Sequence, residues 1–184
     1  MISFVNMNTI PAEIKKKENI AEYIIHMYQT EDLIHAYQFN LDEINAYVIK
    51  HMSKDEQVRK EILLWYAGII EQMQAEGINK PGKHLIATQK YVEALTTLHE
   101  KLLVENDFYQ ATYIKAKKDI ANHIALSDGT INNPIQICLN GIYGMLLIRL
   151  NGKKISAEQQ KTLANFGEVL GTLSRFYKKS EIIS

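Results

Sequence analysis

The sequence is poor in the residues on which several classes of protein depend. It contains one cysteine among 184 residues, so the chain can form neither an internal disulfide nor a zinc site built from cysteines. Three prolines and nine glycines are too few for the many turns of an all-β protein. These shortages favour a helical protein that is held together by an apolar core.

Neither sign of charge is in excess, because 21 Lys and Arg residues balance 21 Asp and Glu residues. A nucleic-acid binder draws its affinity from many phosphate contacts, so we expect no nucleic-acid partner. The balance conceals an asymmetry: residues 1–110 carry a formal charge of −5 and residues 111–184 carry +5. The two halves either neutralise each other within the monomer or leave opposite surfaces that can steer association.

No long apolar run indicates a membrane span or a signal peptide. The most apolar stretch, residues 134–150, includes Gln136 and Asn140, whereas a spanning helix needs ~20 mostly apolar residues. Residues 1–12 lack a basic start and a cleavage site. We therefore expect a cytoplasmic protein without membrane contact, in which residues 1–12 are loosely ordered.

Apolar residues recur every three or four positions along almost the whole chain, and no window alternates with period two. This pattern predicts an all-α fold: a single domain over residues 1–184, built as a bundle of six to seven helices. Capping residues, proline and glycine mark the expected boundaries. The expected segments are residues 13–39, a short helix after Asn40, Ser53 to Gly77, Pro81 to a break near Asn106, then on to the turn at 127–129, 134–150 and 156–179.

Two of these segments contain a pair of glycines within the helix. Gly141 and Gly144 lie in residues 134–150, and Gly167 and Gly171 lie in residues 156–179. Each costs roughly 1 kcal/mol of helix stability relative to alanine. Such glycines indicate either close helix packing or a cavity, and their spacing does not distinguish the two.

Three ionisable residues fall within apolar stripes. At ~100° per residue, Glu31 lies in line with Ile20, while His99 and Arg149 occupy the same kind of position on two other segments. One interpretation is a buried ion pair between Glu31 and Arg149, with His99 as an ordinary core histidine. The other is a polar pocket that these three residues line together with His35 and Tyr143.

Motifs for catalysis or metal binding are missing from the sequence. It has no nucleophile elbow, phosphate-binding loop or dinucleotide-binding glycine pattern. Cys138 lies on an apolar helix face, where a thiol behaves as a small hydrophobe. The spacing of Asp32 and His35 resembles half of a di-iron motif, but it occurs once. We therefore predict no catalytic residue, no metal and no cofactor.

A family resemblance begins in residues 15–24 and 29–34, KKKENIAEYI and QTEDLI. It continues in residues 65–66, 98–103, 139–144 and 149–150. Together these segments resemble an uncharacterised family of small all-helical bacterial proteins of about 180 residues, known as a domain of unknown function. The resemblance implies a helical, cytoplasmic, bacterial protein and supplies no activity. Tyr28 and His35 depart from the tryptophan and arginine that we expect there, so a family pair between Glu31 and position 35 would become sensitive to pH.

Two main kinds of function remain open, beside a third and weaker idea, a nucleic-acid contact by the C-terminal third of the chain. The first is a non-catalytic protein that acts through self-association or a protein partner, because the segment 13–39 is apolar nearly all round and such helices are buried on several sides. The alternative is a helical protein that binds a small molecule or a metal, with enzyme activity left open. Its pocket would be lined by Glu31, His35, His99, Tyr143 and Arg149.

Overall fold

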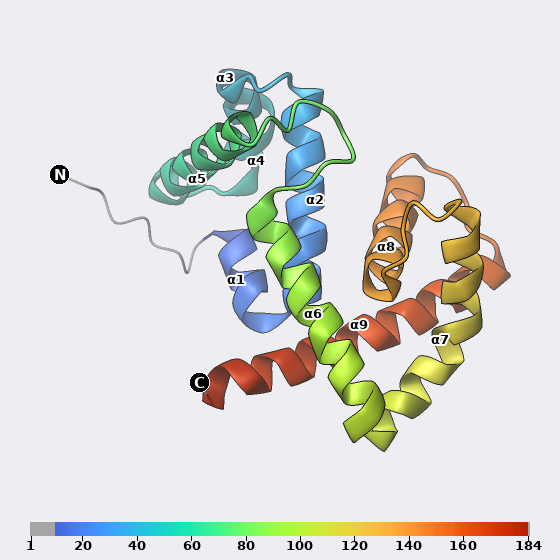
Figure 1. Ribbon diagram of the computed structural model, residues 1–184. Coiled ribbons are helices and arrows are strands. Elements are labelled where there is room, and N and C mark those ends of the chain that lie inside the picture. Colours follow the sequence, from blue (N-terminus) through green and yellow to red (C-terminus); the bar gives the residue numbers. More distant parts are fainter. Residues whose placement is uncertain (1–9, 184) are drawn as a thin grey trace. The chain divides into compact units, whose positions relative to one another are not determined.

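The computed structural model describes residues 10–183, and these residues form helices and no strand (Figure 1). The all-α prediction is therefore confirmed, but the helices are more numerous than the six or seven expected. They are α1 (Pro11–Glu18), α2 (Ile20–Ala36), α3 (Leu41–Ile44), the π-helical turn η1 (Asn45–Ile49), α4 (Lys50–Met52), α5 (Glu56–Ala75), α6 (Ile86–Glu105), α7 (Asp107–Leu126), α8 (Pro134–Leu150) and α9 (Ala157–Ile183).

The chain divides into two compact units by its internal contacts. Among the described residues, unit 1 comprises residues 10–18 and 26–89, and unit 2 comprises residues 19–25 and 90–183. The helices α2 and α6 each contribute residues to both units. The single domain expected from the sequence stays a prediction. None of the helices between residues 10 and 183 combines the length and the apolarity that crossing a membrane requires.

The first expected helix is two helices, because the chain breaks at Asn19. The side chain of Asn19 accepts a hydrogen bond from the Glu22 amide at 3.3 Å and so caps α2. Residues 1–9 of the stretch that we expected to be loosely ordered lie outside the described residues. The remainder is ordered, since Ile10 and Ala12 are fully buried.

Two expected helix starts are wrong. The cap of α5 is Asp55, whose carboxylate accepts hydrogen bonds from the amides of Gln57 and Val58, and not Ser53. Pro81 lies in a loop, and α6 begins at Ile86, whose amide donates to a Glu76 carboxylate oxygen at 2.8 Å. In both places a carboxylate takes the helix amides, which sequence spacing alone did not reveal.

The expected starts of α8 and α9 are confirmed. The side chain of Asn133 accepts from the Ile135 amide at 2.8 Å, with Pro134 at the first helical position of α8. Ser156 and Gln159 form a reciprocal capping box in front of α9, with hydrogen bonds of 3.0 and 3.1 Å. These caps fix where α8 and α9 begin.

The helices α7, α8 and α9 pack against one another within unit 2. Their shared core is made of fully buried apolar side chains: Ala116, Ile120, Ile135, Cys138, Leu139, Phe166, Val169 and Leu173. Burying a side chain of the size of leucine or phenylalanine contributes about 1.5–3 kcal/mol. These three helices therefore form a packed scaffold within unit 2.

Candidate ligand-binding cavity

The five residues of the predicted polar pocket belong to different units. Glu31 and His35 are in unit 1, whereas His99, Tyr143 and Arg149 are in unit 2. Neither unit contains all five. Tyr143 is half-buried and Arg149 is exposed, so the expected burial of Arg149 is wrong. A long cationic side chain near a helix end reaches solvent easily even when its helix face is apolar.

Glu31 is buried, as its helix position predicts, and its carboxylate is fully engaged within unit 1. It accepts hydrogen bonds from the Leu85 amide at 3.1 Å and from Nδ1 of His84 at 2.7 Å. The His84 ring stacks on Tyr28, with 3.6 Å between ring centroids. Glu31 thus attaches the loop before α6 to α2, with one hydrogen bond on each of its carboxylate oxygens.

His35 does not join this network. Its Nε2 atom is buried without a hydrogen-bond partner, and its ring meets Phe39 edge-on at 5.2 Å. In residues 10–183, no three histidine, cysteine or carboxylate side chains lie close enough together to hold a metal ion.

His99 is a core histidine, in line with the simpler of the two interpretations. Its Nδ1 atom lies 2.7 Å from the Tyr109 hydroxyl, and the ring of Tyr113 is 4.7 Å away. Burial lowers the pKa of His99, raises the pKa of both tyrosines and raises the pKa of Cys138 to about 12. This cluster is therefore uncharged at neutral pH, and the Cys138 thiol is a poor nucleophile.

A cavity of about 390 Å³ lies among α7, α8 and α9, the scaffold drawn in yellow to red in Figure 1. No sequence motif indicated this cavity. Its wall combines apolar side chains with polar ones from all three helices. The lining residues are Asp119, Asn122, His123, Leu126, Asn140, Gly141, Gly144, Met145, Ile148, Ile155, Glu158, Gln159, Thr162 and Leu163.

The two glycines of α8 that line the cavity have different surroundings, and Gly144 leaves room for it. A Cβ atom at Gly144 would meet nothing within 4 Å, so this position is open. A Cβ atom at Gly141 would lie 2.8 Å from two ring carbons of Phe166, which is fully buried. Both alternatives left open by the sequence are therefore realised: Gly141 permits close packing, and Gly144 leaves a cavity.

The polar groups of the wall have defined orientations. Nδ1 of His123 lies 2.7 Å from the carbonyl oxygen of Asp119, which can only accept, so Nδ1 carries the hydrogen and a neutral ring offers Nε2 as an acceptor. Oδ1 of Asn140 accepts from Nε2 of Gln136 at 2.7 Å. The wall therefore contains preset hydrogen-bonding groups beside an apolar surface.

The comparisons with known proteins identify a family but no individual curated protein or solved structure. A family model described as a domain of unknown function (DUF4924) matches residues 9–182, nearly the whole chain. The resemblance to a mostly helical family of unknown function, seen in the sequence, is thereby confirmed, while the bacterial source stays a prediction. Neither the curated proteins nor the solved structures contain a match.

Proposed function

The chain belongs to the DUF4924 family, a domain of unknown function, and from that premise we propose that it is a non-catalytic protein that binds a small molecule in the cavity among α7, α8 and α9. The observation that carries the proposal is the cavity of about 390 Å³ whose wall includes Gly144, where a Cβ atom would meet nothing within 4 Å. Small-molecule sites are typically concave, about 300–1,000 Å³ in volume, and mostly apolar with a few placed polar groups.

The composition of the wall supports binding more than catalysis. His123 and Asp119 both line the cavity, but the histidine donates to the backbone carbonyl of Asp119 and not to its carboxylate. A nucleophile activated by an oriented base would need a side-chain relay of the kind that serine and cysteine hydrolases use. The buried Cys138 does not supply one, because burial raises its pKa.

Filling the space beside Gly144 tests the proposal. We expect the neutral fluorescent dye N-phenylnaphthylamine to bind the wild-type chain, because it is apolar and carries one hydrogen-bond donor. The substitution Gly144→Leu places a side chain in the cavity and removes a helical glycine, so it should weaken dye binding at least about tenfold without lowering the melting temperature.

The matched control is Gly167→Leu on α9, an exposed helical glycine that does not line the cavity. It should bind the dye as the wild type does. Wild-type affinity in the Gly144→Leu protein, or no dye binding by the wild type, would overturn the proposal.

A further inference from the structure

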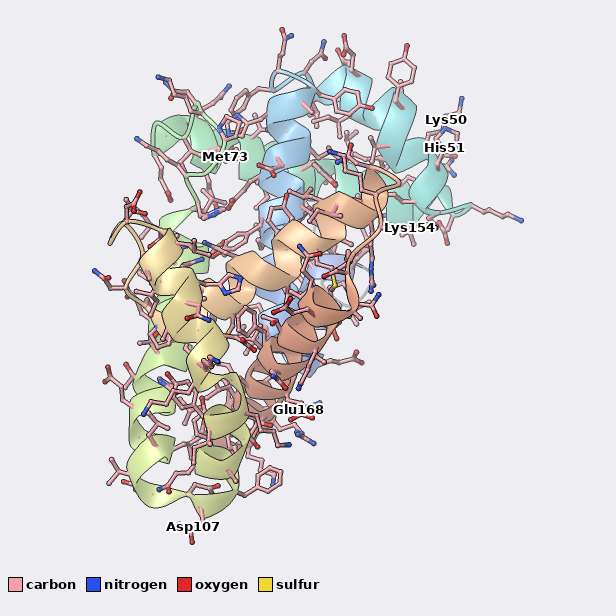
Figure 2. All side chains as sticks on the ribbon, turned by 90° about the vertical axis from the view of Figure 1, so that its right-hand side faces the viewer. Lys50, His51, Met73, Asp107, Lys154 and Glu168 are labelled. Atoms are coloured by element: carbon pink, nitrogen blue, oxygen red, sulfur yellow. The ribbon has the colours of Figure 1, made fainter. Side chains whose placement is uncertain are left out.

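A second hollow, of about 280 Å³, lies where α8 connects to α9 (Figure 2 labels Lys154 there). Its wall is made of Arg149, Lys153, Lys154, Ile155 and Gln160. Three of these five side chains are cationic and none is acidic. None of the three cations has an ion-pair or hydrogen-bond partner among the described residues.

The backbone that carries these cations is fixed. The amide of Lys153 donates to the Ile148 carbonyl at 3.1 Å, and the amide of Gly152 donates to the Arg149 carbonyl at 2.9 Å. With Gly152 at a φ of 68°, this is a Schellman motif, which closes the end of α8. On the other side of the hollow, Nε2 of Gln160 donates to the Ile155 carbonyl at 3.3 Å. The fixed backbone thus places three exposed cationic side chains around one hollow, and an anion bound there would relieve their repulsion.

This basic hollow adjoins the cavity of unit 2. Ile155 lines both spaces, and Ile148, which lines the cavity, directly precedes Arg149 of the hollow. A single molecule can therefore contact both. Building on the proposed function, we propose that the ligand is an amphipathic anion, with an apolar body in the cavity and an oxyanion head held by Arg149, Lys153 and Lys154.

The charges of the cavity wall orient such a ligand. Asp119 and Glu158 line the cavity, while no lysine or arginine does so. The two carboxylates repel an anionic head inside the cavity, and the three cations attract it outside. The apolar body is left to fill the space beside Gly144.

Two dyes that share one aromatic body measure how much the anionic head and the apolar body each contribute to the affinity. Anilinonaphthalene sulfonate is N-phenylnaphthylamine with a sulfonate added, so the ratio of the two affinities measures the contribution of the anionic group. We expect the wild type to bind the sulfonate dye about tenfold more tightly than the neutral dye. The ratio should fall as salt is added, because exposed charges are screened.

Two variants should move this ratio in opposite directions. The triple substitution Arg149→Gln, Lys153→Gln and Lys154→Gln removes the cations and should bring the ratio close to one. The substitution Glu158→Gln removes a repelling carboxylate and should raise the ratio. A merely apolar site would give neither change.

The outcomes distinguish this inference from the proposed function. If the triple variant keeps the wild-type ratio while Gly144→Leu loses both dyes, the anionic ligand is excluded and the cavity stands. If Gly144→Leu retains the sulfonate dye that the triple variant loses, head and body occupy separate sites and the inference is overturned. If the protein binds phosphatidylglycerol vesicles but neither dye, its ligand is a membrane surface, and the inference is also overturned.

Discussion

Two glycines, three residues apart on α8, have opposite surroundings. Gly144 faces open space and Gly141 lies against the ring of Phe166. The sequence predicted that glycines in this helix mark close packing or a cavity, because each weakens the helix for no local gain. It did not predict which glycine does which, since that depends on residues of α9 more than twenty positions away.

These surroundings predict opposite effects of the same substitution. Gly144→Ala should raise the free energy of unfolding by up to about 1 kcal/mol, because alanine favours the helix and meets no neighbour. Gly141→Ala gains the same helix preference but forces the buried Phe166 ring to move, and overpacking costs about 1–3 kcal/mol. We expect a net loss at this position. Urea unfolding of both variants checks the pair, and equal shifts of the same sign would contradict the packing described.

Glu31 shows what helical periodicity predicts about a single residue and what it does not. Its burial followed from its place in the apolar stripe of α2, and the need for a partner followed from the cost of burying a charge. Its partner did not follow, because His84 lies in a loop where no periodicity applies. The same limit applies to Arg149, whose helix face is apolar near a helix end and whose side chain nevertheless reaches solvent.

At the scale of helices, local signals predicted the starts of α8 and α9, where Asn133 with Pro134 and Ser156 with Gln159 form the caps. They missed the start of α5, although its cap, Asp55, also directly precedes the helix. The start of α6 was not predictable from Pro81. Its first amide is taken by Glu76, ten residues earlier, and the preceding amide of Leu85 is taken by Glu31 on α2. Contacts between distant residues therefore decided this boundary.

The buried pair of His99 on α6 and Tyr109 on α7 predicts a pH dependence of stability. Because burial lowers the pKa of His99 in the folded chain, the unfolded chain binds a proton first as the pH falls below 6.5, the ordinary pKa of histidine. The free energy of unfolding should therefore be highest above pH 6.5 and fall toward pH 5.5. His26, whose pKa is lowered by burial and then by Lys15, acts in the same direction.

Urea midpoints at pH 7.5 and 5.5 measure this dependence. His99→Gln should reduce the difference between the two midpoints, and the double variant with His26→Gln should reduce it further. If the two urea midpoints of the His99→Gln protein differ by as much as those of the wild type, this histidine does not titrate as its burial requires.

At the scale of the whole molecule, the division into units changes the meaning of the charge asymmetry. The halves of the sequence carry −5 and +5, but unit 1 carries 9 basic and 11 acidic residues, and unit 2 carries 12 basic and 10 acidic residues. The net charges are then only −2 and +2. Electrostatic self-association loses most of its support, and the cations at the end of α8 become the more informative feature.

Self-association also loses its support from the apolar helix near the N-terminus. The apolar coverage of α2 is accounted for within the chain, since Tyr23, Ile24, Met27, Tyr28 and Ile34 are all buried. Ile25, Leu33 and Tyr37, which lie outside the main stripe, are half-buried. A dimer interface is thus not needed to cover this helix. Self-association or a protein partner stays a prediction.

An exposed ion pair joins two helices of the scaffold: the carboxylate of Glu168 on α9, labelled in Figure 2, pairs with Lys115 of α7 at 3.0 Å. Exposed pairs of this kind contribute little, with a median of about 0–1 kcal/mol. The apolar core and the caps therefore hold these helices together, and the cavity lies beside that core and opens to solvent, since Asn122, His123 and Leu126 in its wall are exposed.

The central claim is that a small molecule binds in this cavity, and nuclear magnetic resonance tests it most directly. The isotope-labelled chain is titrated with N-phenylnaphthylamine while its amide signals are followed. Binding in the cavity predicts saturable shifts confined to its wall, with Asn122, Gly144 and Thr162 among the most affected. Saturable shifts that cluster in unit 1, or none at all at saturating dye, would contradict it.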